Sequence, residues 1–90
     1  MDTIFDLYFE DTLPEVVRAI AGKYLEAYSL FAGLGVWKGE SENSAMLRVV
    51  GSSDMLATMR EVAEEIRAGL KQEAVMLTVH KANTVMIGGS

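Results

Sequence analysis

His80 is the side chain of this sequence best suited to acid–base chemistry near neutral pH, because imidazole titrates at about pH 6.5. It is the only histidine in the 90 residues. One imidazole cannot form a metal site without carboxylates, and no acidic residue stands three or four positions from His80. The sequence therefore predicts no metal site and no catalytic residue. One arrangement stays open, in which His80 is a general base oriented by Asp6 on a shared sheet face.

Three glycines, Gly33, Gly35 and Gly39, lie close together without forming a phosphate-binding motif. Their spacing differs from that of G-x-G-x-x-G, and they lead from a strand into a hairpin rather than into a helix. The chain has no cysteine, which excludes a disulfide framework and a thiolate zinc site. We therefore predict no cofactor.

The aromatic residues Tyr8, Phe31 and Trp37 could form a platform of the kind that stacks single-stranded bases. The net charge, however, is −5, and residues 1–45 carry eight acids against three bases. Because phosphates are bound by clustered lysine and arginine, this balance argues against nucleic acid and an anionic membrane as partners. Nucleic-acid binding ranks last, and we expect the aromatic side chains to be packing anchors in a protein interface.

The elements that must position these residues follow one order twice. Alternating residues 5–9 predict a strand, residues 13–28 a helix and residues 30–38 a second strand. Residues 45–51, 55–70 and 74–80 repeat the order strand, helix, strand, and a short edge strand could follow over 84–87. Thr12 and Glu15 have the spacing of a capping box at the first helix. The polar residues 39–44 are expected to form the turn of a hairpin.

Two split β-α-β halves predict an α+β, ferredoxin-like βαββαβ sandwich. Its antiparallel sheet would have the order 4-1-3-2, with both helices on one face. We expect a single domain over 1–87 and a disordered tail over 88–90. The N-terminus lacks the segments of a signal peptide, and no apolar run has the length of a membrane span. These features predict a cytoplasmic protein without a membrane partner.

Strand alternation assigns one set of side chains to the sheet face without helices. Asp6 and Arg48 belong to the two central strands and could pair there. Most other side chains of this face are apolar, which exceeds what a small monomer usually exposes. We therefore predict a binding or dimer interface, formed by Tyr8, Phe31, Trp37, Met46, Arg48, Met76 and His80.

Three short segments resemble a known group of proteins: Leu7-Tyr8-Phe9, the hairpin residues 35–42 and Gln72-Glu73-Ala74-Val75. They are similar to small ferredoxin-like proteins of unknown function from bacterial, plasmid and phage genomes. The resemblance spans residues 5–87 and implies a fold and a mobile-element origin, but no activity. It would make Trp37, Gly39, Glu42 and Gln72 recurring positions. Glu42 and Gln72 could tie the hairpin to the start of the last strand.

The sequence thus favours a non-enzymatic protein-interaction module, a homodimer formed through the open sheet face. If the chain is phage- or mobile-element-encoded, it could act on a host protein, for example as an inhibitor of host defence. The alternative is a small-ligand-binding protein or a cofactor-independent enzyme of the dimeric α/β-barrel type. Two sheets would then enclose a pocket lined by His80, Asp6, Arg48 and Tyr8, with Glu42 and Gln72 as further pocket candidates.

Overall fold

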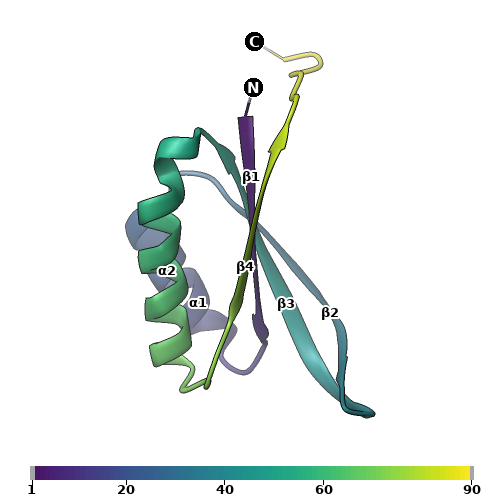
Figure 1. Ribbon diagram of the computed structural model, residues 1–90. Helices are drawn as coiled ribbons and strands as arrows, with labels where there is room; N and C mark the ends of the chain where they lie inside the picture. The colour runs from purple at the N-terminus through teal and green to yellow at the C-terminus, as the bar shows by residue number, and fades with distance from the viewer. Residues whose placement is uncertain (1, 90) are drawn as a thin grey trace.

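A four-stranded antiparallel sheet carries two helices on one face in the computed structural model, which describes residues 2–89 (Figure 1). The elements in chain order are β1 (Asp2–Glu10), α1 (Pro14–Tyr24), β2 (Ser29–Trp37), β3 (Glu40–Gly51), a 3₁₀ turn (Ser53–Met55), α2 (Leu56–Gly69) and β4 (Met76–Ala82). The strand order is β2-β3-β1-β4. This order confirms the predicted ferredoxin-like sandwich.

The hydrophobic core lies between the helices and the sheet. Phe5, Leu7 and Phe9 alternate toward it from β1, in keeping with the alternation of residues 5–9, and the helices contribute buried apolar side chains to the same cluster. The largest fully buried side chains are Phe5, Leu7, Leu47, Met59, Ile66, Val17 and Val62. Since burying one such side chain stabilises the fold by about 1.5–3 kcal/mol, this cluster holds the helices on the sheet.

The first helix is shorter than the predicted 13–28. It ends at Tyr24 because Leu25 adopts an extended backbone, with φ −121° and ψ 131°, and is buried in the core. The predicted capping box at Thr12 is also wrong: Leu13 occupies the N-cap position, and its side chain has no hydrogen-bond acceptor. Before the second helix, the Ser52 hydroxyl does accept a hydrogen bond from the backbone N–H of Asp54, at 3.1 Å.

The hairpin between β2 and β3 has a much tighter turn than the predicted 39–44. Only Lys38 and Gly39 form the turn, with φ values of +50° and +81°. Two such residues are typical of a type I′ turn, whose twist matches that of the paired strands. Trp37 therefore pairs with Glu40, and β3 begins there rather than at Ala45. The longer strands carry the hairpin beyond the helices (Figure 1).

The chain after β4 forms no further strand, in contrast to the short strand that the sequence allowed over 84–87. Val85, Met86 and Ile87 are 79%, 93% and 92% exposed. The hydroxyl of Thr84 donates a hydrogen bond to the carboxylate of Asp2, and the chain then extends away from the sheet (Figure 1). Gly88 and Gly89 follow this segment, whereas Ser90, part of the predicted tail, lies outside the described residues.

Candidate functional site

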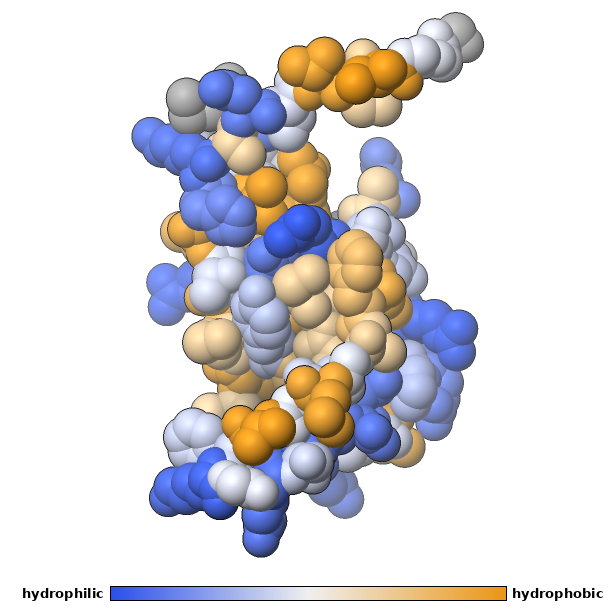
Figure 2. Space-filling view, turned by 90° about the vertical axis from the view of Figure 1, so that its right-hand side faces the viewer, coloured by the Kyte–Doolittle hydropathy of each residue, from blue (hydrophilic) through white to orange (hydrophobic). Residues whose placement is uncertain are grey.

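An apolar row crosses all four strands on the helix-free face of the sheet. The register aligns Phe31 with Met46, Met46 with Tyr8, and Tyr8 with Met76. Phe31 and Met76, on the two edge strands, are 50% and 56% exposed, while Tyr8 and Met46 are partly buried. Hydrophobic and hydrophilic residues are interspersed on this side of the molecule (Figure 2). Four predicted interface residues are thus neighbours.

Asp6 and Arg48 form an ion pair beside this row, as the sequence predicted. The Nε and Nη2 atoms of Arg48 each donate to a different carboxylate oxygen of Asp6, both at 2.8 Å. The Asp6 residue is 2% exposed, whereas the Arg48 side chain is 39% exposed. The hydrogen bond from Arg48 lowers the pKa of Asp6, against the opposing effect of burial. Both carboxylate oxygens are therefore engaged with arginine.

His80 lies on the same face but two residues further along β4 than Thr78, the partner of Asp6. His80 therefore pairs with Ile4 rather than with Asp6. Its side chain is exposed, and its charge makes only a minor contribution to the lowered pKa of Asp6. Within residues 2–89 no hydrogen bond joins His80 to Asp6, whose carboxylate instead accepts from Arg48 through both oxygens, so the structure does not show Asp6 orienting the imidazole as a general base.

A groove of about 690 Å³ lies where β1 ends, β4 begins and the hairpin projects. It has the size of small-ligand sites, which span about 300–1,000 Å³. We call it the ligand groove. Three segments line it: the end of β1 with Tyr8, Phe9, Glu10 and Thr12; the hairpin with Trp37, Glu42 and Ser44; and the connection from α2 to β4, residues 70–76.

Gln72 holds one wall of the ligand groove in place. Its Nε2 donates to the backbone oxygen of Glu10 at 2.6 Å, and its Oε1 accepts from the backbone N–H of Glu10 at 3.1 Å. Arg67 supports it from α2, because its Nη1 donates to the Gln72 carbonyl at 3.2 Å. The expected tie between Gln72 and the hairpin is therefore wrong: the amide joins the α2–β4 connection to the end of β1.

The charge of the ligand groove is mainly negative. Three acidic residues line it, Glu10, Glu42 and Glu73, and Lys71 is the one basic residue of the lining. Trp37 is 70% exposed at the rim. The Nζ of Lys38 already lies over the Trp37 ring, 5.7 Å from its centroid. The three glutamates would attract a further organic cation and repel the phosphates of a nucleotide. The groove therefore suits a ligand with a flat apolar part and a positive charge.

The ligand groove combines residues that the sequence assigned to two different sites. Tyr8, Trp37 and Met76 were expected in the interface, and Glu42 and Gln72 in the pocket, but all five line one groove. Asp6, Arg48 and His80 are not among its lining residues. Glu10, Lys71 and Glu73 also line the groove, although no sequence pattern predicted them as site residues. Their position at the ends of predicted strands was the available signal.

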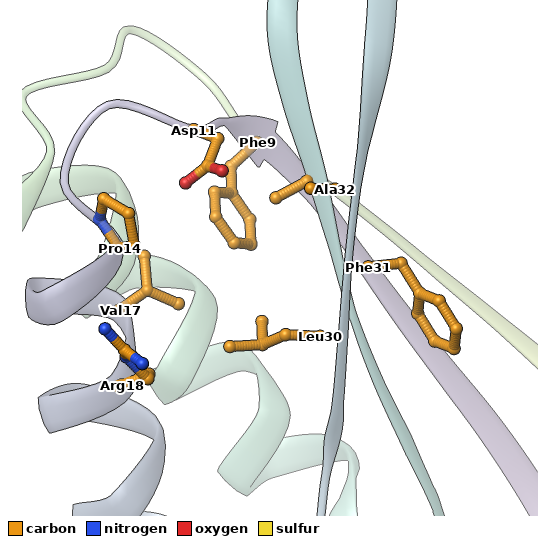
Figure 3. A pocket seen from close by; sticks show the side chains of 9 residues that line it. Phe9, Asp11, Pro14, Val17, Arg18, Leu30, Phe31 and Ala32 are labelled. Carbon is orange, nitrogen blue, oxygen red and sulfur yellow. The ribbon is translucent and has the colours of Figure 1, made fainter.

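A smaller cavity of about 180 Å³ lies between α1 and β2. Figure 3 shows Phe9, Val17, Leu30 and Ala32 around it, while Phe31 points to the other side of the strand. The side chains of Asp11 and Arg18 also belong to its lining. No sequence pattern predicted this cavity, which we call the α1–β2 pocket.

Over residues 2–89, neither helix combines the length and the hydropathy needed to cross a bilayer. Over the same range, no three side chains of histidine, aspartate or glutamate come together as a metal site would need.

Neither a protein-family model nor a curated protein sequence matches this chain. Solved structures do match, at identities that show a shared fold alone. A phage SAM lyase in complex with S-methyl-5'-thioadenosine gives a TM-score of 0.72 at 20% identity, over 89% of this chain and 81% of that chain. The apo state of a phage SAM lyase gives 0.72 at 21% identity, over 87% and 78%.

Two other structures show the same small α+β fold. A DUF3240 family protein from Shewanella baltica OS155 gives a TM-score of 0.73 at 8% identity, over 98% of this chain and 97% of that chain. CPII, a nitrogen regulatory PII-like protein from Thiomonas intermedia K12 bound to ADP, AMP and bicarbonate, gives 0.63 at 9% identity, over 93% and 96%. The expected resemblance is thus confirmed in its coarse form, since similar structures include a phage protein and a DUF3240 family protein.

Proposed function

We propose that this protein binds S-adenosylmethionine in the ligand groove and cleaves it as a lyase, releasing S-methyl-5'-thioadenosine. The proposal rests on one observation: the groove combines the aromatic side chains Tyr8 and Trp37 with the carboxylates of Glu42 and Glu73. S-Adenosylmethionine has the matching parts, a flat nucleobase that stacks on aromatic rings and a sulfonium cation that carboxylates and aromatic faces attract.

The comparisons support this choice of ligand. The phage SAM lyase shares the fold over most of this chain, and its bound molecule, S-methyl-5'-thioadenosine, carries no phosphate. CPII binds ADP and AMP, but phosphates placed in this groove would face Glu10, Glu42 and Glu73, with Lys71 as the one lining base. Charge therefore favours a sulfonium-bearing adenosine ligand over a nucleotide.

Cleavage of this ligand would require positioning more than acid–base catalysis. In an intramolecular displacement, an oxygen of the methionine carboxylate forms a bond to the γ-carbon while the carbon–sulfur bond breaks. The sulfur keeps the electron pair and leaves as neutral S-methyl-5'-thioadenosine, and the remaining fragment closes to homoserine lactone. The step transfers no proton. Trp37 and Glu42 would hold the adenosine and the sulfonium, and a fixed geometry is the main source of acceleration.

The experiment is incubation of the purified protein with S-adenosylmethionine, followed by chromatography and mass spectrometry. We expect S-methyl-5'-thioadenosine to accumulate. Trp37→Ala and Glu42→Gln should each lower kcat/KM at least about tenfold, which corresponds to about 1.4 kcal/mol of transition-state stabilisation. Glu61→Gln, which changes an exposed carboxylate of α2 outside the groove, is the matched control and should retain full activity.

Isotopically labelled water separates a lyase from a hydrolase. Direct attack of water would place the solvent oxygen on the γ-carbon, whereas lactone formation leaves the oxygen of the carboxylate there. The proposal would be refuted if S-adenosylmethionine is not converted and calorimetry detects binding of ADP or AMP but no binding of S-adenosylmethionine.

A second function, the non-enzymatic interaction module, is favoured by the apolar row on the helix-free face. Phe31 and Met76 expose about half of their surface at its two ends, and an apolar strip of this kind on a small domain is typical of a protein interface. A second copy of the chain is the simplest partner, and a host-defence protein is the further hypothesis. Met46→Glu should dissociate such a homodimer in light scattering. A wild-type chain that stays monomeric at high micromolar concentration would exclude it.

A further inference from the structure

β2 lies at one edge of the sheet without the usual protection against pairing with another chain. Within the described residues no strand neighbours its outer side, and most of its nine residues are exposed. Natural edge strands are normally guarded by charged residues or proline. Ser29–Trp37 contains neither, whereas β4, at the opposite edge, carries Lys81 and His80. β2 is therefore an open template for strand addition.

The segment after β4 is suited to pair with such an open edge. Residues 83–89 carry no charge, and three consecutive apolar side chains, Val85, Met86 and Ile87, are almost fully exposed. Valine and isoleucine favour the extended backbone of a strand. The segment projects from the body of the molecule, and hydrophobic atoms make up much of the projection (Figure 2). We call residues 84–87 the arm.

The α1–β2 pocket offers a place for side chains of an added strand. Leu30 and Ala32 of β2 line it on one side, and Val17 of α1 on another (Figure 3). Side chains of a strand alternate between the two faces of a sheet. A strand beside β2 would therefore direct every second side chain to the helix-covered side, where this pocket lies. Val85 and Ile87 are two residues apart and would therefore point to the same side of an added strand.

We propose that the arm of one copy adds as a fifth strand to the outer edge of β2 in a second copy, with Val85 and Ile87 directed to the α1–β2 pocket. The arm is poorly placed to reach its own β2, because β1 and β3 separate the two edges by about 14 Å, three strand spacings of about 4.8 Å. It also points away from the sheet (Figure 1).

The contact is head-to-tail, since it joins two different edges of identical chains. Contacts of this type close into a ring when the rotation permits and otherwise continue as a filament. The proposed surface does not require the ligand groove to be occupied. If strand addition fails its test, the proposed lyase function still stands. If the lyase function fails its test, strand addition still stands.

A pair of truncations tests the arm. One variant ends at Asn83 and lacks the arm, while the matched control ends at Ile87 and lacks only the residues after it. In a Met46→Glu background, which removes association through the apolar row, light scattering over a range of concentrations should show association of the full chain and of the control, and a monomer for the variant that ends at Asn83. Circular dichroism checks that the shorter variant is folded. A shorter variant that is folded and still associated would overturn the proposal.

Hydrogen exchange and substitution identify the partner surface. Backbone amides on the outer side of β2 should exchange at least tenfold more slowly in the control than in the variant that ends at Asn83. Ala32→Arg should fill the α1–β2 pocket and weaken association at least tenfold, whereas Ala57→Arg, on the exposed start of α2, should not. Equal exchange in both truncations, or a full chain that is monomeric at every concentration, would refute strand addition.

Discussion

The substitution Arg48→Met removes one half of the ion pair on the helix-free face and leaves the other half buried. Asp6 is almost fully buried and lies between the two neighbours of β1 in the sheet. Without Arg48, its carboxylate keeps the cost of leaving water and loses both hydrogen bonds that offset this cost. Removing one partner of a buried pair costs about 3–5 kcal/mol, and we expect Arg48→Met to lie in this range at neutral pH.

Asp6→Asn should cost less, about 1 kcal/mol. The Arg48 side chain is 39% exposed and can turn its guanidinium toward water, so little charge stays uncompensated. The introduced amide also keeps one acceptor oxygen near Arg48. The two single substitutions therefore break the same pair at unequal cost. The difference follows from the unequal burial of its two members.

The pH dependence gives an independent check of this reasoning. In the wild type the Arg48 hydrogen bond holds the pKa of Asp6 below its ordinary value of 3.8. A lowered folded-state pKa stabilises the fold fully above the unfolded pKa, and this contribution is lost as the pH falls through the folded pKa. In Arg48→Met, burial raises the pKa of Asp6 and only the minor opposing effect of the His80 charge remains. The free energy of unfolding that Arg48→Met loses relative to the wild type should therefore become smaller on acidification while the pH is still above about 4.

Urea denaturation followed by far-ultraviolet circular dichroism, at neutral pH and near pH 4, measures both effects. Fluorescence is less suitable, since Trp37 is already exposed in the folded state. Asp6→Asn is the control, because its deficit should change only as the pH falls below the ordinary aspartate pKa. Equal costs for the two substitutions, or a deficit of Arg48→Met that stays constant between neutral pH and pH 4, would refute the argument.

Three further substitutions test the groove, the hairpin and the core. Gln72→Ala should destabilise the fold by about 1–3 kcal/mol in urea titrations, because the N–H and C=O of Glu10 lose their partner. Gly39→Val should cost more than about 1 kcal/mol and speed amide exchange along the hairpin, since φ is +81° there; an unchanged exchange rate would contradict this. Met59→Ala should lower stability by about 2–5 kcal/mol, whereas Met76→Ala, on an exposed side chain, should cost less than about 1 kcal/mol.

The alternation of apolar and polar residues was enough to predict the architecture. Phe5, Leu7 and Phe9 face the core and Asp6 the other side, because successive side chains of a strand point to opposite faces. The same rule predicted that Asp6 and Arg48 share the helix-free face of the two central strands and could pair there, and the structure aligns them in register. Where burial follows a local period, a single sequence is enough to predict which face of a strand or helix each side chain occupies.

Element ends depended on tertiary contacts instead. The first helix stops at Tyr24 because Leu25 enters the core in an extended conformation, although the apolar period continues to Tyr28. The tight turn at Lys38 and Gly39 adds five residues to β3 before Ala45 and so creates the projecting hairpin. Polar residues at 40–44 are equally compatible with a loop and with an exposed strand, and only the pairing with β2 distinguishes the two.

Residue types and their local period predicted that Trp37 lies on the open sheet face, whereas Glu42 and Gln72 were singled out by the resemblance and expected in a separate pocket. Only the folded chain decided that they share one groove with Tyr8 and Glu10. The wall of that groove depends on a side-chain amide bound to a backbone 62 residues away. Every residue presents the same backbone N–H and C=O, so a contact of this kind leaves no mark in the sequence.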